Sequence, residues 1–171
     1  MLIGEKVNLR RIEKPDLWQL WKWHEERGLY LFLKQKLFIS WDELNENFIK
    51  YFGWKGDFLI EDKRGKAFGV CSYQDVNWKN RSCELALQAY GSEQTFAVDA
   101  VTILLNFLFD EFNLSRVSSF VPEFLTFEIQ TLKRAGFILE GELREVVFRN
   151  DKYQDILIYA ILKEESEKEI L

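Results

Sequence analysis

Two glutamates hold positions from which a carboxylate could remove a proton. Glu84 lies in a segment predicted to be a β-strand, and Glu140 lies close to the strands that end the chain. A carboxylate in a partly desolvated cleft can take a proton from a substrate, directly or through water. Each is therefore a candidate general base. The alternative for each is an ordinary sheet carboxylate paired with Arg81 or Arg144.

The sequence gives little support for a metal site or for a functional role of its cysteines. The chain contains one histidine, His24, and two cysteines, Cys71 and Cys83, with no cluster at metal-ligand spacing. His24 falls on the apolar face of a predicted helix, which favours a structural role. If the chain turns near Asn77, the two cysteines lie opposite each other as small buried side chains. We therefore expect no metal site and no disulfide framework.

The composition predicts one globular domain. The chain has 171 residues, of which 47% are hydrophobic and 30% charged, and its net charge is −5. Broad nucleic-acid binding needs a basic face, so this acidic balance argues against it. No segment has the length and apolarity of a signal peptide or a membrane span, and we expect a cytoplasmic protein with no membrane partner. The predicted domain covers residues 1–163, and residues 164–171 form a charged tail.

The spacing of apolar residues predicts an α/β fold built on a largely antiparallel sheet. Apolar positions recur every three or four residues in the predicted helices, and strand-like segments are joined by short turns. The predicted order is β-α-α-β-β-β-α-β-α-β-β. Strands are expected at 6–10, 57–61, 66–76, 82–90 and 116–121, and from 137 to a hairpin over 146–162; helices are expected at 15–28, from 40, at 97–112 and at 126–135.

Several short phrases occur at particular places in this order of elements. They are residues 4–10 followed by Pro15-Asp16, Gly69 with 80–85, 112–117, 134–137 with 140–145, and Tyr153 with Asp155. No single phrase is specific. Together, in this order and over nearly the whole chain, they resemble the GNAT N-acetyltransferases, and most closely their ribosomal-protein alanine acetyltransferase branch.

The resemblance implies a cleft between two diverging central strands, with acetyl-CoA as co-substrate and its pyrophosphate at the N-terminus of the long helix. Unpaired N–H groups and the helix dipole favour an anion at such a position. Lys133 and Arg134 are expected to reach the phosphates of CoA. The other residues expected to contact acetyl-CoA are Leu87, Gln94, Phe96, Ala97 and Val98.

The expected phosphate loop departs from the family pattern. The pattern begins with a basic or amide residue and has a glycine three positions later, where this chain has Ser92 and Thr95. Glu93 adds a negative charge where a pyrophosphate would lie. Two interpretations stay open: an unusual acetyl-CoA loop, or a helix that Ser92 caps and whose dipole Glu93 stabilises from the first turn.

A second departure follows the strand at 116–121. Leu125 and Glu128 stand where the branch commonly has an asparagine and a serine. Leu132 stands where a tyrosine, a candidate acid for the leaving thiolate, is often found. A leucine cannot donate a proton. These departures favour an alternative to catalysis, a degenerate GNAT-fold module that binds a partner.

Tryptophans are concentrated in the N-terminal third of the chain. Trp18 and Trp23 leave the apolar face set by Leu17, Leu20 and Trp21. Three interpretations stay open for this aromatic group: a packed core, a protein interface, or a wall of the acceptor pocket. The group also includes Trp41, Trp54, Phe32, Phe38, Phe48 and Phe52.

The resemblance predicts an acetyltransferase that moves an acetyl group from acetyl-CoA to a primary amine. The acceptor is either a protein N-terminus or a small, polyamine-like amine, and the sequence does not name it. The expected assembly is a monomer or a homodimer. The alternative, the degenerate binding module, predicts stable folding without transferase activity.

Overall fold

The computed structural model describes residues 1–27, 40–48, 56–90 and 93–166. The main helices and strands follow the predicted order, with a further short strand at the N-terminus and a further short helix after the last strand. The elements are β1 (Leu2–Ile3), β2 (Val7–Arg11), η1 (Lys14–Asp16), α1 (Leu17–Arg27), α2 (Trp41–Glu46), β3 (Gly56–Asp62), β4 (Ala67–Asn77), β5 (Ser82–Ala89), α4 (Gln94–Asn106), η3 (Phe107–Glu111), β6 (Arg116–Pro122), α5 (Thr126–Arg134), β7 (Ile138–Arg149), β8 (Lys152–Leu162) and α6 (Lys163–Ser166).

The strands of the described residues form one eight-stranded mixed sheet in the order β1-β2-β3-β4-β5-β6-β8-β7. Every neighbouring pair is antiparallel except β5 and β6, which are parallel. Parallel neighbours need a long crossover, and α4 with η3 supplies it. The predicted α/β fold on a largely antiparallel sheet is confirmed.

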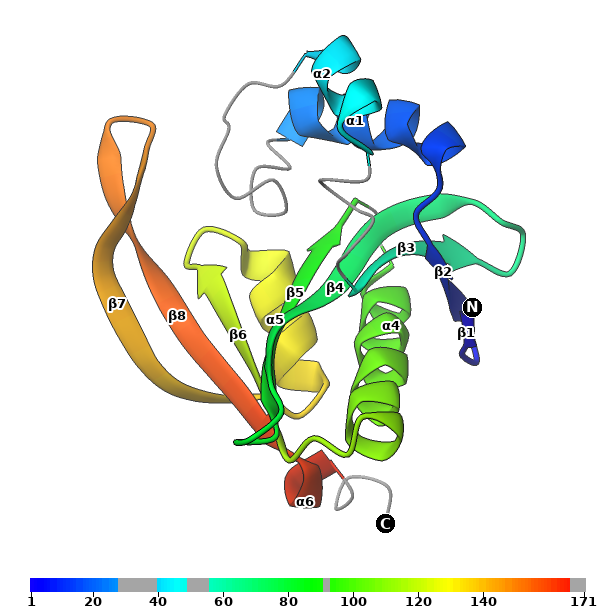
Figure 1. The fold of residues 1–171 in the computed structure, drawn as a ribbon. Coiled ribbons are helices and arrows are strands. Elements are labelled where there is room, and N and C mark those ends of the chain that lie inside the picture. Colours follow the sequence, from blue (N-terminus) through cyan, green and yellow to red (C-terminus); the bar gives the residue numbers. More distant parts are fainter. Residues whose placement is uncertain (28–39, 49–55, 91–92, 167–171) are drawn as a thin grey trace.

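Strands β5 and β6 diverge soon after they meet (Figure 1). Along these two fully described strands, pairing covers three positions, from Ser82↔Arg116 to Glu84↔Ser118. On its other edge β5 stays paired with β4 as far as Ala89. The edge of β5 beyond Glu84 is therefore open toward β6, which is the divergence that the family resemblance implies.

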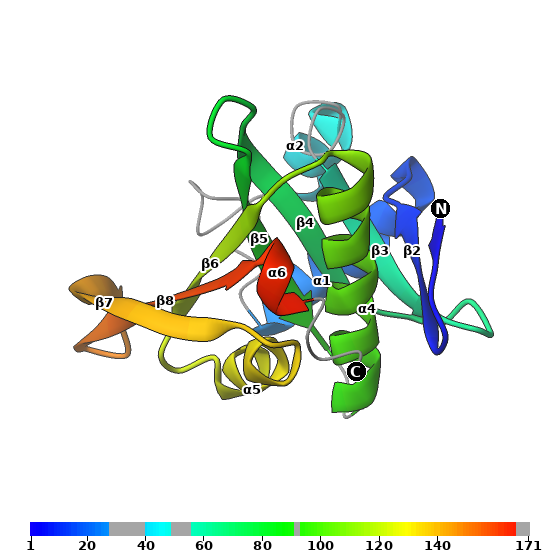
Figure 2. The ribbon, with the colours of Figure 1, turned by 90° about the horizontal axis from the view of Figure 1, so that it is seen from below.

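Helices cover both faces of the sheet, and the alternation of strand side chains divides the core in two. Ile60 and Cys71 pack with α4 and α5 in the larger cluster. Their chain neighbours Leu59 and Val70 pack with α1 and α2 in the smaller one. Successive residues of a strand project to opposite faces, so β3 and β4 contribute to both clusters. Figure 2, seen from below, shows α4 and α5 packed along the sheet.

Left-handed residues end the two helices of the larger layer. The helix after β5 continues from α4 into the π-helical turn η3, and Asn113 then adopts φ 53°. Gly136 follows α5 with φ 87°. Asparagine and glycine tolerate this conformation better than other residues, which is why both are recognisable as helix ends in the sequence. The predicted ends of both helices are confirmed.

The predicted pairing of the two cysteines is wrong. Cys71 lies opposite Leu87, and Cys83 lies four residues nearer the turn. The turn is centred later than Asn77, at residues 78–81, and an irregularity between Gln74 and Asn77 shifts the register. Both cysteines are nevertheless buried and free. Burial raises the pKa of both thiols, that of Cys83 to about 12.

An ion-pair cluster fixes the start of the α1 layer on the sheet. Arg10 of β2 donates to both carboxylate oxygens of Asp16 at 2.8 and 2.9 Å, and to Glu61 of β3 at 3.1 Å. The backbone amide of Glu13 also donates to Asp16 at 2.7 Å. Burial raises the pKa of Asp16, but these hydrogen bonds more than offset it, and the pKa lies below its usual value.

Asp16→Asn is therefore expected to destabilise the protein by about 1–2 kcal/mol at pH 7. Because the folded-state pKa is lowered, the Asp16 contribution is complete above the unfolded pKa of about 3.9 and is lost as pH falls through the folded value. The difference between parent and variant should therefore shrink below about pH 4. Urea unfolding at pH 7, 5 and 3 measures this difference in the free energy of unfolding between parent and variant. A difference that stays constant with pH would assign the loss to packing instead.

No helix in the described ranges is long and apolar enough to cross a membrane. The last described element, α6, runs from Lys163, the last residue of the predicted domain, into the first three residues of the predicted charged tail. The domain limit at residue 163 stays a prediction.

Candidate functional site

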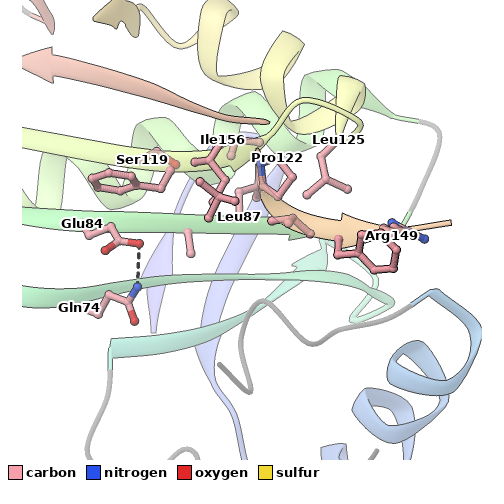
Figure 3. A pocket seen from close by; sticks show the side chains of 14 residues that line it. Gln74, Glu84, Leu87, Ser119, Pro122, Leu125, Arg149 and Ile156 are labelled. Atoms are coloured by element: carbon pink, nitrogen blue, oxygen red, sulfur yellow. Dashed lines mark hydrogen bonds between the residues drawn. The ribbon is translucent and has the colours of Figure 1, made fainter. Parts of the chain in front are cut away.

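A cavity of about 560 Å³ opens where β5 and β6 diverge. Its size falls within the range of small-molecule sites. Figure 3 shows its walls: β5 and β6, the end of the β7–β8 hairpin, and Leu125 before α5. The lining residues are Gln74, Glu84, Ala86, Leu87, Ser119, Phe120, Val121, Pro122, Leu125, Val146, Val147, Phe148, Arg149 and Ile156.

Glu84, the first candidate base, lines this cavity. It is half-buried on β5, and Gln74 of β4, directly opposite in the register, donates a hydrogen bond from Nε2 to Glu84 Oε1 at 2.9 Å (Figure 3). The predicted alternative partner, Arg81, instead donates to Asn113. Gln74 therefore fixes the position of the carboxylate without adding a positive charge beside it.

Glu140, the second candidate base, lies elsewhere. It is exposed near the start of β7, whereas the cavity is lined by the end of that strand, from Val146 to Arg149. Arg116 binds both of its carboxylate oxygens, one at 2.8 Å, and this hydrogen-bonded pair holds the pKa of Glu140 below its usual value. The partner is Arg116 and not Arg144. The structure does not bring Glu140 and Glu84 together, and a catalytic role for Glu140 stays a prediction.

The residues predicted to bind acetyl-CoA fall into three positions. Leu87 lines the cavity. Gln94 begins α4 and donates from Nε2 to Phe127 O and to Gln130 Oε1 of α5, at 3.4 and 3.3 Å. Phe96, Ala97 and Val98 belong to the larger core: Ala97 is fully buried, Val98 packs at its edge and the Phe96 ring packs on Phe68, with centroids 5.6 Å apart.

Lys133 and Arg134 lie away from the start of α4. Because β5 and β6 are parallel, α4 and α5 follow them from the same end of the sheet (Figure 1). Both residues are exposed in the last turn of α5, at its opposite end. Their predicted contact with the phosphates of CoA stays a prediction that this placement does not favour.

The start of α4 differs from the predicted capped helix. Ser92 lies outside the described residues. Glu93 is at the N-cap position, not in the first turn, and its side chain makes no capping hydrogen bond. Its carbonyl accepts from the amides of Phe96 and Ala97 at 3.0 and 3.4 Å. The first turn of α4 thus begins without a side-chain cap from Glu93.

The three residues in the second departure have different roles. Leu125 lines the cavity. Glu128 is buried on α5 and is not among the cavity-lining residues, so it is not placed as an acid there. Leu132 is fully buried in the larger core cluster. Leu132 is thus a packing residue of the core.

The aromatic group at α1 and α2 is mostly core. Trp23 is buried and stacks on Tyr90 with centroids 4.6 Å apart, so the expectation that it leaves the apolar face is wrong. Trp18 is half exposed and stacks on Trp21 at 5.2 Å, and Trp41 meets both edge-on. Trp54, Phe32, Phe38, Phe52 and the His24 side chain lie outside the described residues.

Sequence reasoning missed five lining residues with polar or aromatic side chains. They are Gln74, Ser119, Phe120, Phe148 and Arg149. Gln74 had a usable signal, since it faces Glu84 once the hairpin register is set correctly. Ser119 and Phe120 belong to β6 itself. Phe148 and Arg149 depend on how far the β7–β8 hairpin reaches over β6, and no local pattern encodes that distance.

This geometry can accommodate an extended ligand. The open edge of β5 offers backbone groups to such a ligand, the cavity lies beside it, and the start of α4 follows the same strand. The family model for the acetyltransferase (GNAT) domain matches residues 9–158. The chain belongs to the GNAT acetyltransferase family. GNAT acetyltransferases use acetyl-CoA, which is therefore the co-substrate, and the activity class is acetyl transfer to an amine.

Individual GNAT relatives agree with this assignment. The chain is 25% identical to spermidine N(1)-acetyltransferase of Vibrio cholerae, over 94% of this chain and 95% of the relative. It is 31% identical to an uncharacterized, prophage-derived N-acetyltransferase of Bacillus subtilis, over 64% and 63%. The crystal structure of the V. cholerae spermidine N-acetyltransferase in complex with CoA and spermine shares the fold, with a TM-score of 0.80, 24% identity, and coverage of 94% and 98%. The ribosomal-protein alanine branch is not confirmed.

Proposed function

We propose that this GNAT protein acetylates the primary amine of a small molecule, with Glu84 as the general base. The position of Glu84 carries the proposal: it is the single carboxylate among the described residues that line the cavity at the β5–β6 divergence. The similarity to a spermidine N(1)-acetyltransferase supports a small acceptor over a protein N-terminus.

The chain's own residues supply a base, its orientation and an apolar wall. A primary amine is protonated at neutral pH and must lose a proton before it can attack a carbonyl. The Glu84 carboxylate accepts that proton, and Gln74 holds the carboxylate through the bond at 2.9 Å. The apolar side chains of Leu125 and Ile156 line the same cavity.

Acetyl-CoA supplies the acetyl group as an activated thioester. The residues best placed to hold it are the open backbone edge of β5 from Leu85 to Ala89, the side chain of Leu87, and the first turn of α4 with Gln94. Backbone amides at a helix start favour an anion. Glu93 opposes it, because its exposed carboxylate stands at the same helix end.

A binding and product assay tests the proposal. Calorimetry with acetyl-CoA up to millimolar concentration should give heat, and mass spectrometry should detect acetylated small amines. Failure to bind acetyl-CoA would refute the proposal and favour the degenerate module. That alternative has no support from the comparisons. It would be favoured by a cavity that Phe96 or Glu93 blocks, and neither is among the described residues lining the cavity. Acetylation confined to peptide N-termini would overturn the small-molecule acceptor.

The double change Glu93→Gly and Thr95→Gly is expected to tighten CoA binding about tenfold, equivalent to about 1–2 kcal/mol. It removes one negative charge and lets the backbone approach a phosphate more closely. Two glycines at a helix start should also lower the free energy of unfolding by about 1–2 kcal/mol. Calorimetry and urea unfolding measure the two effects.

Glu93→Gln serves as the matched variant for that experiment, because it removes the charge and keeps the side chain. It should retain part of the affinity gain with little loss of stability. Weaker CoA binding in the double variant would show that the Glu93 carboxylate does not oppose the phosphates.

A further inference from the structure

Three large apolar side chains at the mouth of the cavity are exposed to solvent. Phe120, Val146 and Phe148 are 41, 51 and 63% exposed, and all three line the cavity. They come from β6 and from the end of β7, and Ile156 of β8 lies beside them. Exposed apolar groups around a cavity favour a ligand that buries them.

The described lining of the cavity carries two charged side chains of opposite sign. Among the described lining residues, Glu84 is the single anion and Arg149 the single cation. The Arg149 guanidinium lies over the Phe124 ring, 4.5 Å from its centroid.

A cluster of carboxylates on the β7–β8 hairpin faces away from the cavity. Ile156 lines the cavity, so its neighbour Asp155 projects from the other face of β8. Glu142, opposite Leu157 in the register, shares that other face. Asp155 also accepts a hydrogen bond from the Glu145 amide at 2.7 Å, and Glu123 accepts from the Asp155 amide at 3.2 Å. These acids are therefore engaged outside the cavity.

A polyamine would bring charges that this cavity does not match. When one of its amines gives up a proton to Glu84, its remaining amines stay positively charged. Buried charges need partners of opposite sign, and the described lining offers Arg149 instead. An amine with an uncharged apolar body would bury Phe120, Val146 and Phe148 at no such cost.

Resting on the proposed function, we infer that the acceptor is an apolar monoamine: a primary amine on an alkyl or arylalkyl body, not a polyamine. One ammonium meets Glu84, and the body covers the apolar mouth. This distinguishes the chain from its relative named as a spermidine acetyltransferase.

Competing acceptors test the inference. The full-length protein is assayed with acetyl-CoA and hexylamine, 2-phenylethylamine or spermidine at one pH, with product identified by mass spectrometry. We expect kcat/KM for the apolar amines to exceed that for spermidine by at least about tenfold. Equal or higher kcat/KM with spermidine would overturn the inference and leave the proposed function intact. Acetylation of none of the amines would overturn the proposed function itself.

A charge reversal separates the role of Arg149 from a general effect of net charge. Arg149→Glu should raise kcat/KM for spermidine by about tenfold. For the apolar amines, any fall in kcat/KM should be smaller than about tenfold. Lys152→Glu makes the same charge change on the same hairpin, at a residue that is exposed and does not line the cavity. Equal gains in both variants would show that the cavity charge does not select the acceptor.

Discussion

Glu84→Gln is expected to lower kcat by about 10²–10³-fold at pH 7 while changing the free energy of unfolding by less than about 1 kcal/mol. Glutamine has the same shape, and its amide oxygen still accepts the hydrogen bond that Gln74 Nε2 donates to this position at 2.9 Å. The side chain is therefore held as before, but it cannot accept a proton from the amine.

The pH dependence tests this interpretation. As pH approaches the amine pKa of about 10, a growing fraction of the acceptor arrives neutral and needs no base. The defect of the variant should therefore narrow between pH 7 and pH 10. Thiol release with saturating amine measures kcat, and urea unfolding measures stability. A defect that is independent of pH would indicate a lost contact, not a lost base.

Glu140→Gln is the matched control. It removes a charge from an exposed carboxylate bound by Arg116, outside the cavity. We expect kcat within about twofold of the parent and a stability loss of at most about 1 kcal/mol, as for other exposed ion pairs. A large loss of kcat in this variant, with Glu84→Gln active, would transfer the role of base to Glu140.

The order of the elements could be predicted because each has a local signal. Ser40 caps α2 by accepting a hydrogen bond from the Glu43 amide, as its position before an apolar repeat indicates. Asn113 and Gly136 mark helix ends through their tolerance of positive φ. These signals lie within a few residues of the feature that they specify.

Predictions that needed a precise register were less accurate. The cysteine pair failed because a turn displaced by two or three residues moves every partner on the opposite strand. Trp23 was misplaced because the periodicity of one helix face does not include the Tyr90 ring, which packs on it from the end of β5.

The candidate site was predicted in part for the same reason. Glu84 and Leu87 lie beside the divergence of β5 and β6, and the family resemblance already implied that divergence. The contribution of Phe148 and Arg149 depends on a long hairpin that extends past the sheet, with Glu145 at φ 58° and an irregular register between Leu143 and Val147. The distance that a hairpin extends past its sheet cannot be read from the pattern of a single sequence.

Leu132→Ala is expected to lower the free energy of unfolding strongly, with little effect on kcat. The side chain is fully buried against the larger core, where it joins α5 to the sheet. Truncating a buried leucine removes its transfer free energy and leaves a cavity, at a cost of about 3–5 kcal/mol. For a domain of this size the melting temperature should fall by about 6–20 °C.

The same variant decides whether this position acts in catalysis. Leu132 does not line the cavity, so kcat measured well below the melting temperature should stay within about twofold of the parent. Leu143→Ala, at a side chain 42% exposed on β7, controls for the loss of a leucine side chain and should cost less than about 1 kcal/mol. A hundredfold fall in kcat for folded Leu132→Ala would give the residue a functional role. We expect Leu132→Ala to lose stability and keep activity, whereas Glu84→Gln should lose activity and keep stability. The two variants differ because Leu132 packs in the core and Glu84 lines the cavity.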